Sequence, residues 1–363
     1  MKKFLFASVA LIGAVAATGL AAQERTVRVF NWSDYIDESV LEEFTKETGI
    51  KVVYDVFDSN EMLETKLLAG GTGYDVVVPT GTFLGRQIQA GVFQKLDKSK
   101  LPNLENMWPQ IMGRIEKFDP GNEHAINYMW GTTGFGYNVE KIKERMPDAP
   151  LDSWDMIFKP EVISKFADCG VHLLDTADEI FPAALNYLGL DPDSSNPEDF
   201  EKASELLLSI RPYIQKFHSS EYINALANGD ICLAVGWSGD VLQARDRAEE
   251  ADNGTTVGYS IPKEGTMMWF DMMAIPVDAP NKANANAFLD YIMRPDVIAK
   301  ATNYVNYANA NKASQEFIDA GVLEDPAVYP SEAVLDRLFT TPALPPRAQR
   351  VATREWTRVK TGQ

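Results

Sequence analysis

The sequence is poor in cysteine and histidine, with two and three residues respectively among 363. Zinc sites gather several of these residues close together, whereas His124, His172 and His218 lie far apart, so we expect no metal site. The sequence also has no phosphate-binding glycine loop, no HExxH motif and no complete GxGxxG motif. From the motifs present we therefore expect neither a cofactor nor an enzymatic activity.

The sequence has a single long hydrophobic run, from Phe4 to Leu20. Two lysines precede the run and two alanines follow it, which is typical of a secretory signal peptide cleaved after Ala21 or Ala22. As a membrane anchor the run is barely long enough, and polar residues follow it at once. No cysteine stands at the cleavage site to carry a lipid anchor. We expect residues 1–22 to be removed from a soluble, exported protein.

Basic residues are scarce as well: the sequence has 34 lysines and arginines but 52 aspartates and glutamates, which gives a formal net charge of −18. Loss of Lys2 and Lys3 takes the exported chain two charges lower, to −20. Such a protein repels nucleic acids and anionic lipids, and it attracts cations to any cleft that carboxylates line. Acidity can also serve solubility alone, so the charge excludes nucleic acid as a partner without identifying a ligand.

The two cysteines are Cys169 and Cys232. An even pair in an exported protein is typical of a disulfide bond, and two buried free thiols are the alternative. In the chain-entropy model, closing a loop of this length stabilises a fold by roughly 4 kcal/mol.

About 340 residues remain after the signal peptide, more than one hydrophobic core usually supports, so we expect two lobes. The first lobe begins with alternating strands and helices, which favour an α/β fold with a parallel sheet covered on both faces. Ligands of such sheets bind beyond the carboxyl ends of the strands, where Trp32 and Thr80 fall. The expected elements are strands at 26–30, 51–57 and 74–78, a helix at 38–48, and a second helix that Ser59 caps and Gly70 ends.

Two extended segments are expected to cross between the lobes, at 125–138 and 256–262. Between them we expect further helices and strands, including one helix from Trp154 to Lys165. The predicted N-terminal lobe comprises 23–131 and 256–303. The predicted C-terminal lobe comprises 132–255 and 304–363.

One short run combines an aromatic ring with a carboxylate: Gly236-Trp237-Ser238-Gly239-Asp240, just after an apolar strand. Its small residues are expected to let the backbone turn sharply, and a cation would find both a ring face and a counter-charge there. The pairing recurs in Trp32-Ser33-Asp34-Tyr35 and in Trp269-Phe270-Asp271. Core tryptophans and helix-capping aspartates are the alternative interpretation.

Six segments occur in an order that resembles the periplasmic putrescine- and spermidine-binding proteins of polyamine ABC transporters. The resemblance runs from about Val27 to the C-terminus. It implies a two-lobed type II periplasmic binding protein fold with two crossover strands at the hinge. It also implies a monomer that captures a polyamine between its lobes and delivers it to an inner-membrane ABC permease. The segments are Asn31 to Ile36, Val77 to Thr80, His218 to Ile223, Leu226 to Cys232, Gly236 to Asp240 and Tyr307 to Lys312.

The resemblance also implies the residues of the site. Three aromatic rings would sandwich the methylene chain: Trp32, Trp237 and Trp269. Asp240 and Asp271 would hold ammonium groups, with Glu179, Asp34 and Ser33 in support, partly through water. Further contacts would come from Tyr35, Thr80, Ser219 and Tyr307. Family members that bind putrescine commonly carry serine at Thr80 and phenylalanine at Trp269, so the length of the ligand stays open.

Two other functions remain as alternatives. The first is binding of another cationic amine such as a betaine, for which an aromatic box with fewer carboxylates is expected. The second is a secreted hydrolase in which Glu179 acts with Asp240 or Asp271.

Overall fold

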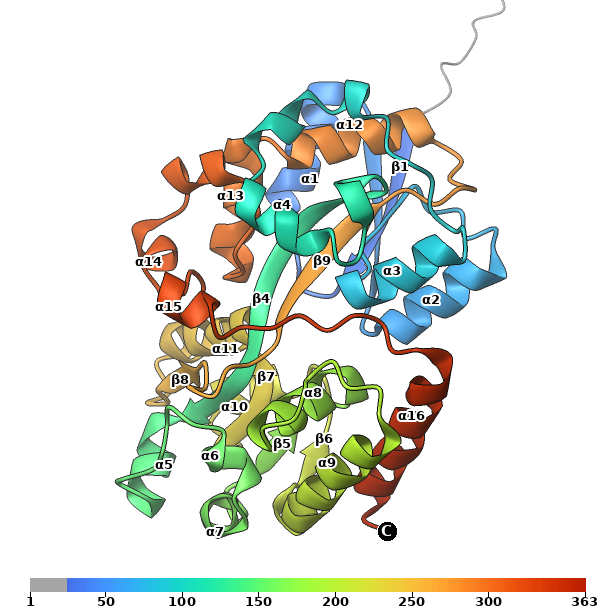
Figure 1. Ribbon diagram of the computed structural model, residues 1–363. Helices are drawn as coiled ribbons and strands as arrows, with labels where there is room; N and C mark the ends of the chain where they lie inside the picture. The colour runs from blue at the N-terminus through green and yellow to red at the C-terminus, as the bar shows by residue number, and fades with distance from the viewer. Residues whose placement is uncertain (1–24) are drawn as a thin grey trace, which may run out of the picture.

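The computed structural model describes residues 25–363 and shows an α/β protein built of two lobes (Figure 1). The expected signal peptide, residues 1–22, lies outside the described residues, so its cleavage stays a prediction. Within the described range no helix has both the length and the apolar character needed to cross a membrane.

The first lobe starts with the predicted alternation of strands and helices. Strand β1 pairs with β2 and with β3, in both cases in parallel, as predicted. The helix boundaries follow their caps: the Asp37 side chain accepts a hydrogen bond from the Ser39 amide, and Gly49 ends the same helix with a φ of 67°. The elements are β1 (Thr26–Trp32), α1 (Glu38–Thr48), β2 (Lys51–Phe57), α2 (Asn60–Ala69), β3 (Val76–Val77) and α3 (Gly81–Gln89).

The long strand β4 (Ala125–Asn138) joins the two lobes, as its sequence predicted. Its first half, through Thr132, pairs with β9 (Met268–Ala274) in the first lobe. Its second half, from Thr133, pairs with β7 (Leu233–Trp237) and β8 (Val257–Ser260) in the second lobe. The nine strands found between residues 25 and 363 therefore form one sheet in the order β2-β1-β3-β9-β4-β7-β5-β6, with β8 also on β4.

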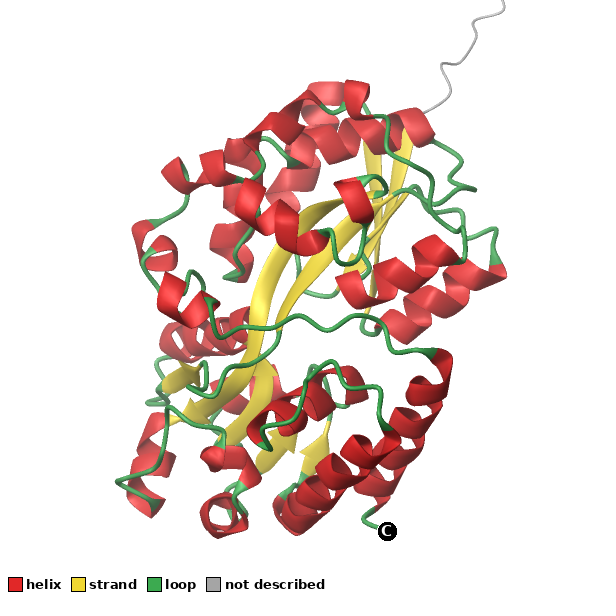
Figure 2. Cartoon of the chain, in the orientation of Figure 1, coloured by secondary structure: helices red, strands yellow, loops and turns green. Residues whose placement is uncertain are grey.

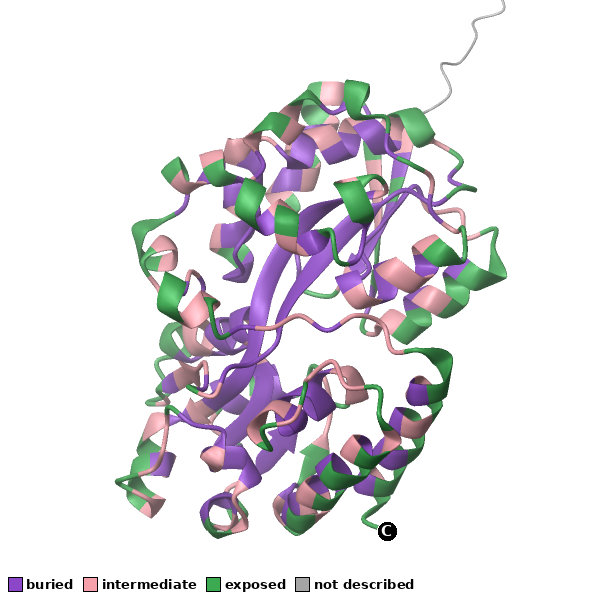
Figure 3. Cartoon of the chain, in the orientation of Figure 1, coloured by how far each residue is buried: buried purple, intermediate pink, exposed green. Residues whose placement is uncertain are grey.

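The second predicted crossing, 256–262, begins as β8, and the chain then reaches the sheet of the first lobe in β9. Figure 2 shows the strands running through both lobes with helices on either side of them. In Figure 3 strands β4 and β9 are buried almost throughout, whereas β8 is half-buried after Val257. The lobes are therefore connected by a continuous buried ribbon of strands.

The second lobe has its own parallel strands, since β5 pairs in parallel with β6 and with β7. The single helix expected from Trp154 to Lys165 is wrong. Pro160 disfavours helical backbone at Lys159, so the segment divides into α6, α7 and a 3-10 turn. The elements are α5 (Val139–Arg145), α6 (Asp155–Phe158), α7 (Pro160–Ile163), β5 (Val171–Leu173), α8 (Ala177–Tyr187), α9 (Pro197–Ile210), β6 (Lys216–Phe217), α10 (Tyr222–Ala227) and α11 (Ser238–Ala251).

The remaining helices cover the first lobe and close the second. They are α4 (Pro109–Ile115), α12 (Lys282–Ile292), α13 (Pro295–Val305), α14 (Ala320–Leu323), α15 (Glu332–Leu335) and α16 (Pro346–Thr361). Between α15 and α16 the chain crosses from the upper to the lower lobe a further time, as an extended segment without a strand (Figure 1).

The tail packs differently from the expected assignment of 304–363 to the second lobe. Val328 and Leu338 belong to the core of the first lobe, and the Trp130 amide in β4 donates to the Ala308 carbonyl at 2.7 Å. The core of the second lobe takes only the end of the tail, namely α16, through residues such as Trp356, and Leu344 just before it. The sequence concealed this because both parts of the tail are amphipathic. We propose a lobe boundary near residue 340, and the other predicted limits stay proposals.

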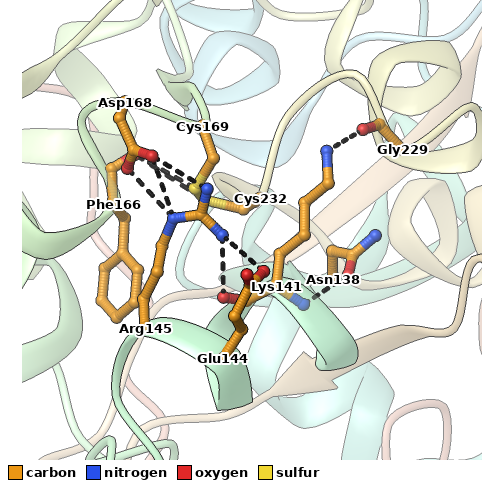
Figure 4. The surroundings of a disulfide bond; sticks show 9 residues. All are labelled: Asn138, Lys141, Glu144, Arg145, Phe166, Asp168, Cys169, Gly229 and Cys232. Carbon is orange, nitrogen blue, oxygen red and sulfur yellow. Dashed lines mark hydrogen bonds and ion pairs between the residues drawn. A yellow bond between two sulfur atoms is a disulfide. The ribbon is translucent and has the colours of Figure 1, made fainter.

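The predicted disulfide bond between Cys169 and Cys232 is confirmed. Figure 4 shows it beside the ion pair of Arg145 with Asp168, whose closest atoms lie 2.8 Å apart. Cys169 precedes β5 and Cys232 precedes β7, two neighbouring parallel strands, and 63 positions separate them in the chain. The bond therefore fastens two strand entrances of the second lobe and lies away from the cleft.

Candidate ligand-binding cleft

A cavity lies between the lobes, and residues of both lobes line it. It opens beyond the carboxyl ends of the strands: Trp32 ends β1, Thr80 follows β3, and Trp237 ends β7. This is where ligands of open α/β sheets bind. All twelve residues predicted for the site line it: Trp32, Ser33, Asp34, Tyr35, Thr80, Glu179, Ser219, Trp237, Asp240, Trp269, Asp271 and Tyr307.

Asp271 projects from β9 and is 6% exposed. Its Oδ1 accepts a hydrogen bond from Thr80 Oγ1 at 2.7 Å, and its Oδ2 accepts one from Tyr35 Oη at 2.8 Å. Asn60 orients the threonine by accepting from its amide at 3.1 Å and donating to its hydroxyl at 3.0 Å. Burial raises the pKa of Asp271 to about 6, although the two hydroxyl donors lower it.

Asp240 lies in the first turn of α11, in the second lobe. Its Oδ1 accepts a hydrogen bond from Tyr307 Oη at 2.7 Å, and its Oδ2 accepts one from Tyr222 Oη at 2.8 Å. Burial raises its pKa to about 6 against the opposing effect of the two tyrosines. Asp240 and Asp271 therefore have matching environments, each with two neutral hydroxyl donors.

Glu179 stands in the first turn of α8 and is 7% exposed. The Thr133 hydroxyl donates a hydrogen bond to its Oε2. Burial raises the pKa of Glu179 to about 8, while hydrogen bonds from Thr133 and Trp237 act to lower it. The raised pKa favours the protonated carboxyl, and a cation beside it would favour loss of that proton.

Aromatic rings of both lobes form the walls of the cavity. The rings of Trp32 and Trp237 lie 6.5 Å apart at 65°, and those of Trp269 and Tyr307 lie 5.1 Å apart at 69°. Trp32 is fixed by a hydrogen bond from its Nε1 to the Val78 carbonyl at 3.0 Å. These flat faces suit a hydrocarbon chain or a cation.

The glycines beside Trp237 do not make the sharp turn that the sequence analysis expected. Strand β7 runs through Gly236 to Trp237 and α11 begins at the next residue. The glycines instead leave room for rings. A Cβ added at Gly236 would lie 2.5 Å from the Tyr222 ring, and one added at Gly239 would lie 2.5 Å from the Tyr307 ring. Both tyrosines bind Asp240, so the motif serves the carboxylate through close packing.

The polar residues at the mouth are less enclosed. The Asp34 side chain is 63% exposed and lies 4.0 Å from Arg247 of α11, across the cleft. Its backbone has a φ of 52°, a left-handed conformation that aspartate tolerates better than most residues. Ser219 accepts a hydrogen bond at its Oγ from the Asp175 amide at 3.1 Å. These residues reach the cavity at its opening.

Thirteen further lining residues were missed. Many follow a strand directly: 57–61 stand at the end of β2, and Asp175 and Thr176 follow β5. The rule that ligands meet the carboxyl ends of strands could have found them, had it been applied to every strand. The set is Phe57, Asp58, Ser59, Asn60, Glu61, Thr82, Phe83, Asp175, Thr176, Asp178, Ser220, Ile223 and Met267.

The cavity is strongly one-sided in charge. Eight of its lining residues are aspartate or glutamate, and in the part of the chain that the structure covers no lysine, arginine or histidine lines it. Between residues 25 and 363 no cluster of three or more histidine, cysteine or acidic side chains is placed to hold a metal ion. Asp34 and Asp175 have basic partners outside the lining, Arg247 and Lys360. Among the described residues Asp240, Asp271 and Glu179 have no ion-pair partner, and carboxyl groups of this kind between aromatic walls suit an organic cation.

Comparison with known proteins decides the family. A model of the bacterial extracellular solute-binding proteins matches residues 39–330. The chain belongs to this family. Its members bind solutes and are not enzymes, so the hydrolase hypothesis does not hold.

Several relatives of this solute-binding protein carry specific names. It is 55% identical over 366 residues to the putrescine-binding periplasmic protein SpuD of Pseudomonas aeruginosa (strain UCBPP-PA14), covering 100% of both chains. It is 54% identical over 365 residues to the putrescine-binding periplasmic protein PotF of Escherichia coli (strain K12), covering 100% of this chain and 99% of that one. A solved structure described as a putative spermidine/putrescine ABC transporter from Listeria monocytogenes matches with a TM-score of 0.82 and 32% identity, covering 93% of this chain and 100% of that one.

Proposed function

We propose that this protein captures a polyamine, putrescine or spermidine, in the cleft and delivers it to an ABC permease for import. The observation that carries the proposal is the pair of carboxylates, Asp271 from the first lobe and Asp240 from the second. Each accepts hydrogen bonds from two neutral hydroxyls and has no basic partner in the cleft. A ligand that supplies positive charge to both would also hold the lobes together.

The rest of the cavity suits the remainder of such a ligand. A linear diamine is charged at both ends and apolar between them, so it requires separated carboxylates along a slot with aromatic walls. Trp32, Trp237 and Trp269 line that slot. Each ammonium group has three N–H donors, for which Glu179 and the hydroxyls of Ser33 and Ser219 offer further acceptors.

A betaine fits the cleft less well. A quaternary ammonium group has no N–H donor, so it would leave the buried oxygens of Asp240 and Asp271 without direct hydrogen bonds from the ligand. Its own carboxylate would also meet a lining that carries eight acidic residues and no basic one among those described. The carboxylate-rich lining therefore favours a polyamine.

The proposed setting follows from the relatives, which are named as periplasmic binding proteins and as components of polyamine ABC transporters. We propose that the chain is exported to the periplasm through the signal peptide at 1–22, and that it acts as a monomer beside an inner-membrane permease.

Thermal unfolding with a panel of amines tests the function. A ligand at a thousandfold excess over its dissociation constant stabilises the folded protein by about 4 kcal/mol. We expect putrescine, cadaverine, spermidine or spermine to raise the unfolding temperature, in an order that ranks chain lengths, and glycine betaine to leave it unchanged. Protein unfolded and dialysed before refolding serves as the ligand-free control. No shift with any polyamine in that sample would contradict the proposal.

The affinity for putrescine should fall as the pH is lowered from about 8 to about 5. The amine stays charged over this range, whereas Asp240 and Asp271, with pKa values raised by burial to about 6, gain protons. Binding favours the charged forms of both aspartates, so at a pH near or below about 6 it releases protons from them. Glu179, whose burial raises its pKa to about 8, adds proton release near neutral pH. Titration calorimetry in buffers of different ionisation enthalpy measures both effects, and an affinity independent of pH would contradict the charge assignment.

A further inference from the structure

Tyr222 lies behind the cleft and contacts two of its residues without lining the cavity. It is the first residue of α10 and is fully buried. Its Oη donates a hydrogen bond to Asp240 Oδ2 at 2.8 Å and accepts one from the Trp237 amide at 3.1 Å. One hydroxyl therefore fixes both a carboxylate and the backbone of an aromatic wall.

The place of the ring is set by Gly236, the residue before Trp237. A Cβ added at Gly236 would lie 2.5 Å from Cε2 and 2.8 Å from Cζ of the Tyr222 ring. A Cβ atom essentially never lies within 3.0 Å of a ring carbon, so only glycine lets the ring approach the strand this closely. The hydroxyl reaches Asp240 and Trp237 together because the ring rests against bare backbone.

We propose that Tyr222 is a positioning residue that holds Asp240 and Trp237 in the geometry of binding. Gly236 is required because, having no side chain, it leaves room for the Tyr222 ring. The inference rests on the proposed function, because it assigns the two residues that Tyr222 holds to the ligand. Tyr222 itself does not touch the ligand.

The hydroxyl affects the charge of Asp240 as well as its place. Donation from Tyr222 lowers the pKa of Asp240 and so favours the charged form that an ammonium group needs. Without that donor, Asp240 keeps Tyr307 as its remaining side-chain donor and takes up a proton at a higher pH. Asp240 also interacts, through hydrogen bonds or electrostatically, with groups on other elements and on its own helix. These are Tyr307 from the tail, Arg247 from α11, Asp34 and Tyr35 from the loop after β1, and Asp271 from β9.

Tyr222→Phe removes the hydroxyl and keeps the ring. A hydrogen bond to a charged group is worth enough that its loss weakens binding about tenfold. We expect this loss for putrescine near pH 7.5, and we expect the fall of affinity with decreasing pH to begin at a higher pH than in the wild type. Calorimetric titration of both proteins from about pH 5 to about pH 9 measures the affinity and its pH profile.

Tyr187→Phe is the matched control. The Tyr187 hydroxyl also donates to an aspartate, Asp155 Oδ1, at 2.8 Å in the same lobe, and it does not line the cavity. We expect this variant to bind as the wild type does at every pH. An equal loss in the two variants, or a loss in Tyr222→Phe that is the same at every pH, would overturn the inference.

Gly236→Ala tests the contact between Gly236 and the Tyr222 ring by changing the glycine instead of the tyrosine. The added methyl group displaces the Tyr222 ring, so we expect weaker putrescine binding, and we expect the losses of Gly236→Ala and Tyr222→Phe to be less than additive in the double variant. Gly113→Ala in α4 is the control, because a Cβ there meets no atom within 4 Å. Wild-type affinity in Gly236→Ala would overturn the role assigned to Gly236.

The wild type and Asp240→Asn separate this inference from the proposed function. If the wild type binds no polyamine, the function itself is wrong. If the wild type binds, Asp240→Asn loses affinity, and Tyr222→Phe keeps the wild-type affinity and pH profile, the function holds and only the role of Tyr222 is wrong.

Discussion

Asp271→Ala is expected to nearly abolish putrescine binding, with a loss of about 3–5 kcal/mol, roughly a hundredfold to several thousandfold in affinity. Asp271 is buried, and both of its oxygens are already held by Thr80 and Tyr35. An ammonium group that enters the variant cleft gives up its hydration and finds no counter-charge on that side. The remaining carboxylates cannot move to replace it, because Asp240 is held in the opposite lobe by Tyr222 and Tyr307.

Two further variants make the result specific. Asp271→Asn keeps the size and the ability to accept hydrogen bonds and removes only the charge, so it should lose nearly as much affinity as the alanine variant. Asp75→Asn is the matched control. Asp75 is buried in the same lobe, accepts hydrogen bonds from the Arg28 and Asn281 amides at 2.8 and 2.6 Å, and does not line the cavity. Titration calorimetry on the folded proteins should find near wild-type affinity in Asp75→Asn. Wild-type affinity in Asp271→Asn would contradict the assignment of Asp271 as a counter-charge.

Replacing both Cys169 and Cys232 with serine is expected to lower the free energy of unfolding by about 4 kcal/mol. The disulfide bond closes a loop with a sequence separation of 63, and its removal returns that loop's freedom to the unfolded chain. Because the bond fastens the entrances of β5 and β7 and does not line the cavity, putrescine affinity well below the unfolding temperature should stay near that of the wild type. Urea unfolding of the two proteins measures the difference.

Reduction of the wild type gives the control for this pair of substitutions. Wild-type protein unfolded in the presence of a reducing agent should match the double-serine variant, whereas the variant itself should not respond to the agent. An unfolding midpoint that neither change moves would contradict a stabilising role for the disulfide bond.

Local sequence signals accounted for much of the fold. Helix α1 was predictable because Asp37 and Gly49 are residues that cap helices, and β4 was predictable because extended residues with spaced glycines continue from Ala125 to Asn138. The place of each part of the tail could not be predicted, since its apolar residues do not reveal which core they fill. Val328 and Leu338 pack on the first core, far from α16 on the second.

The cleft was predictable where a motif carried its own chemistry, as in the pairs of tryptophan and aspartate. The hydrogen bonds that hold those side chains were not, although Tyr35, Thr80 and Tyr307 were predicted as contacts of the ligand. Thr133 is 46 positions from Glu179, and Tyr35 is 236 positions from Asp271. Such pairings depend on the completed sheet, which no local pattern describes. The glycines beside Trp237 were misinterpreted for the same reason, because the rings that need their space come from Tyr222 and Tyr307.

The division of the tail between the lobes constrains the order in which this protein can fold. The first core lacks Val328 and Leu338 until nearly the whole chain is present, and the second lacks the helix 346–361 until the end. Neither core can therefore be completed before the C-terminal part of the chain is present. We therefore expect a fragment that stops before residue 340 to leave the second core exposed and prone to aggregate.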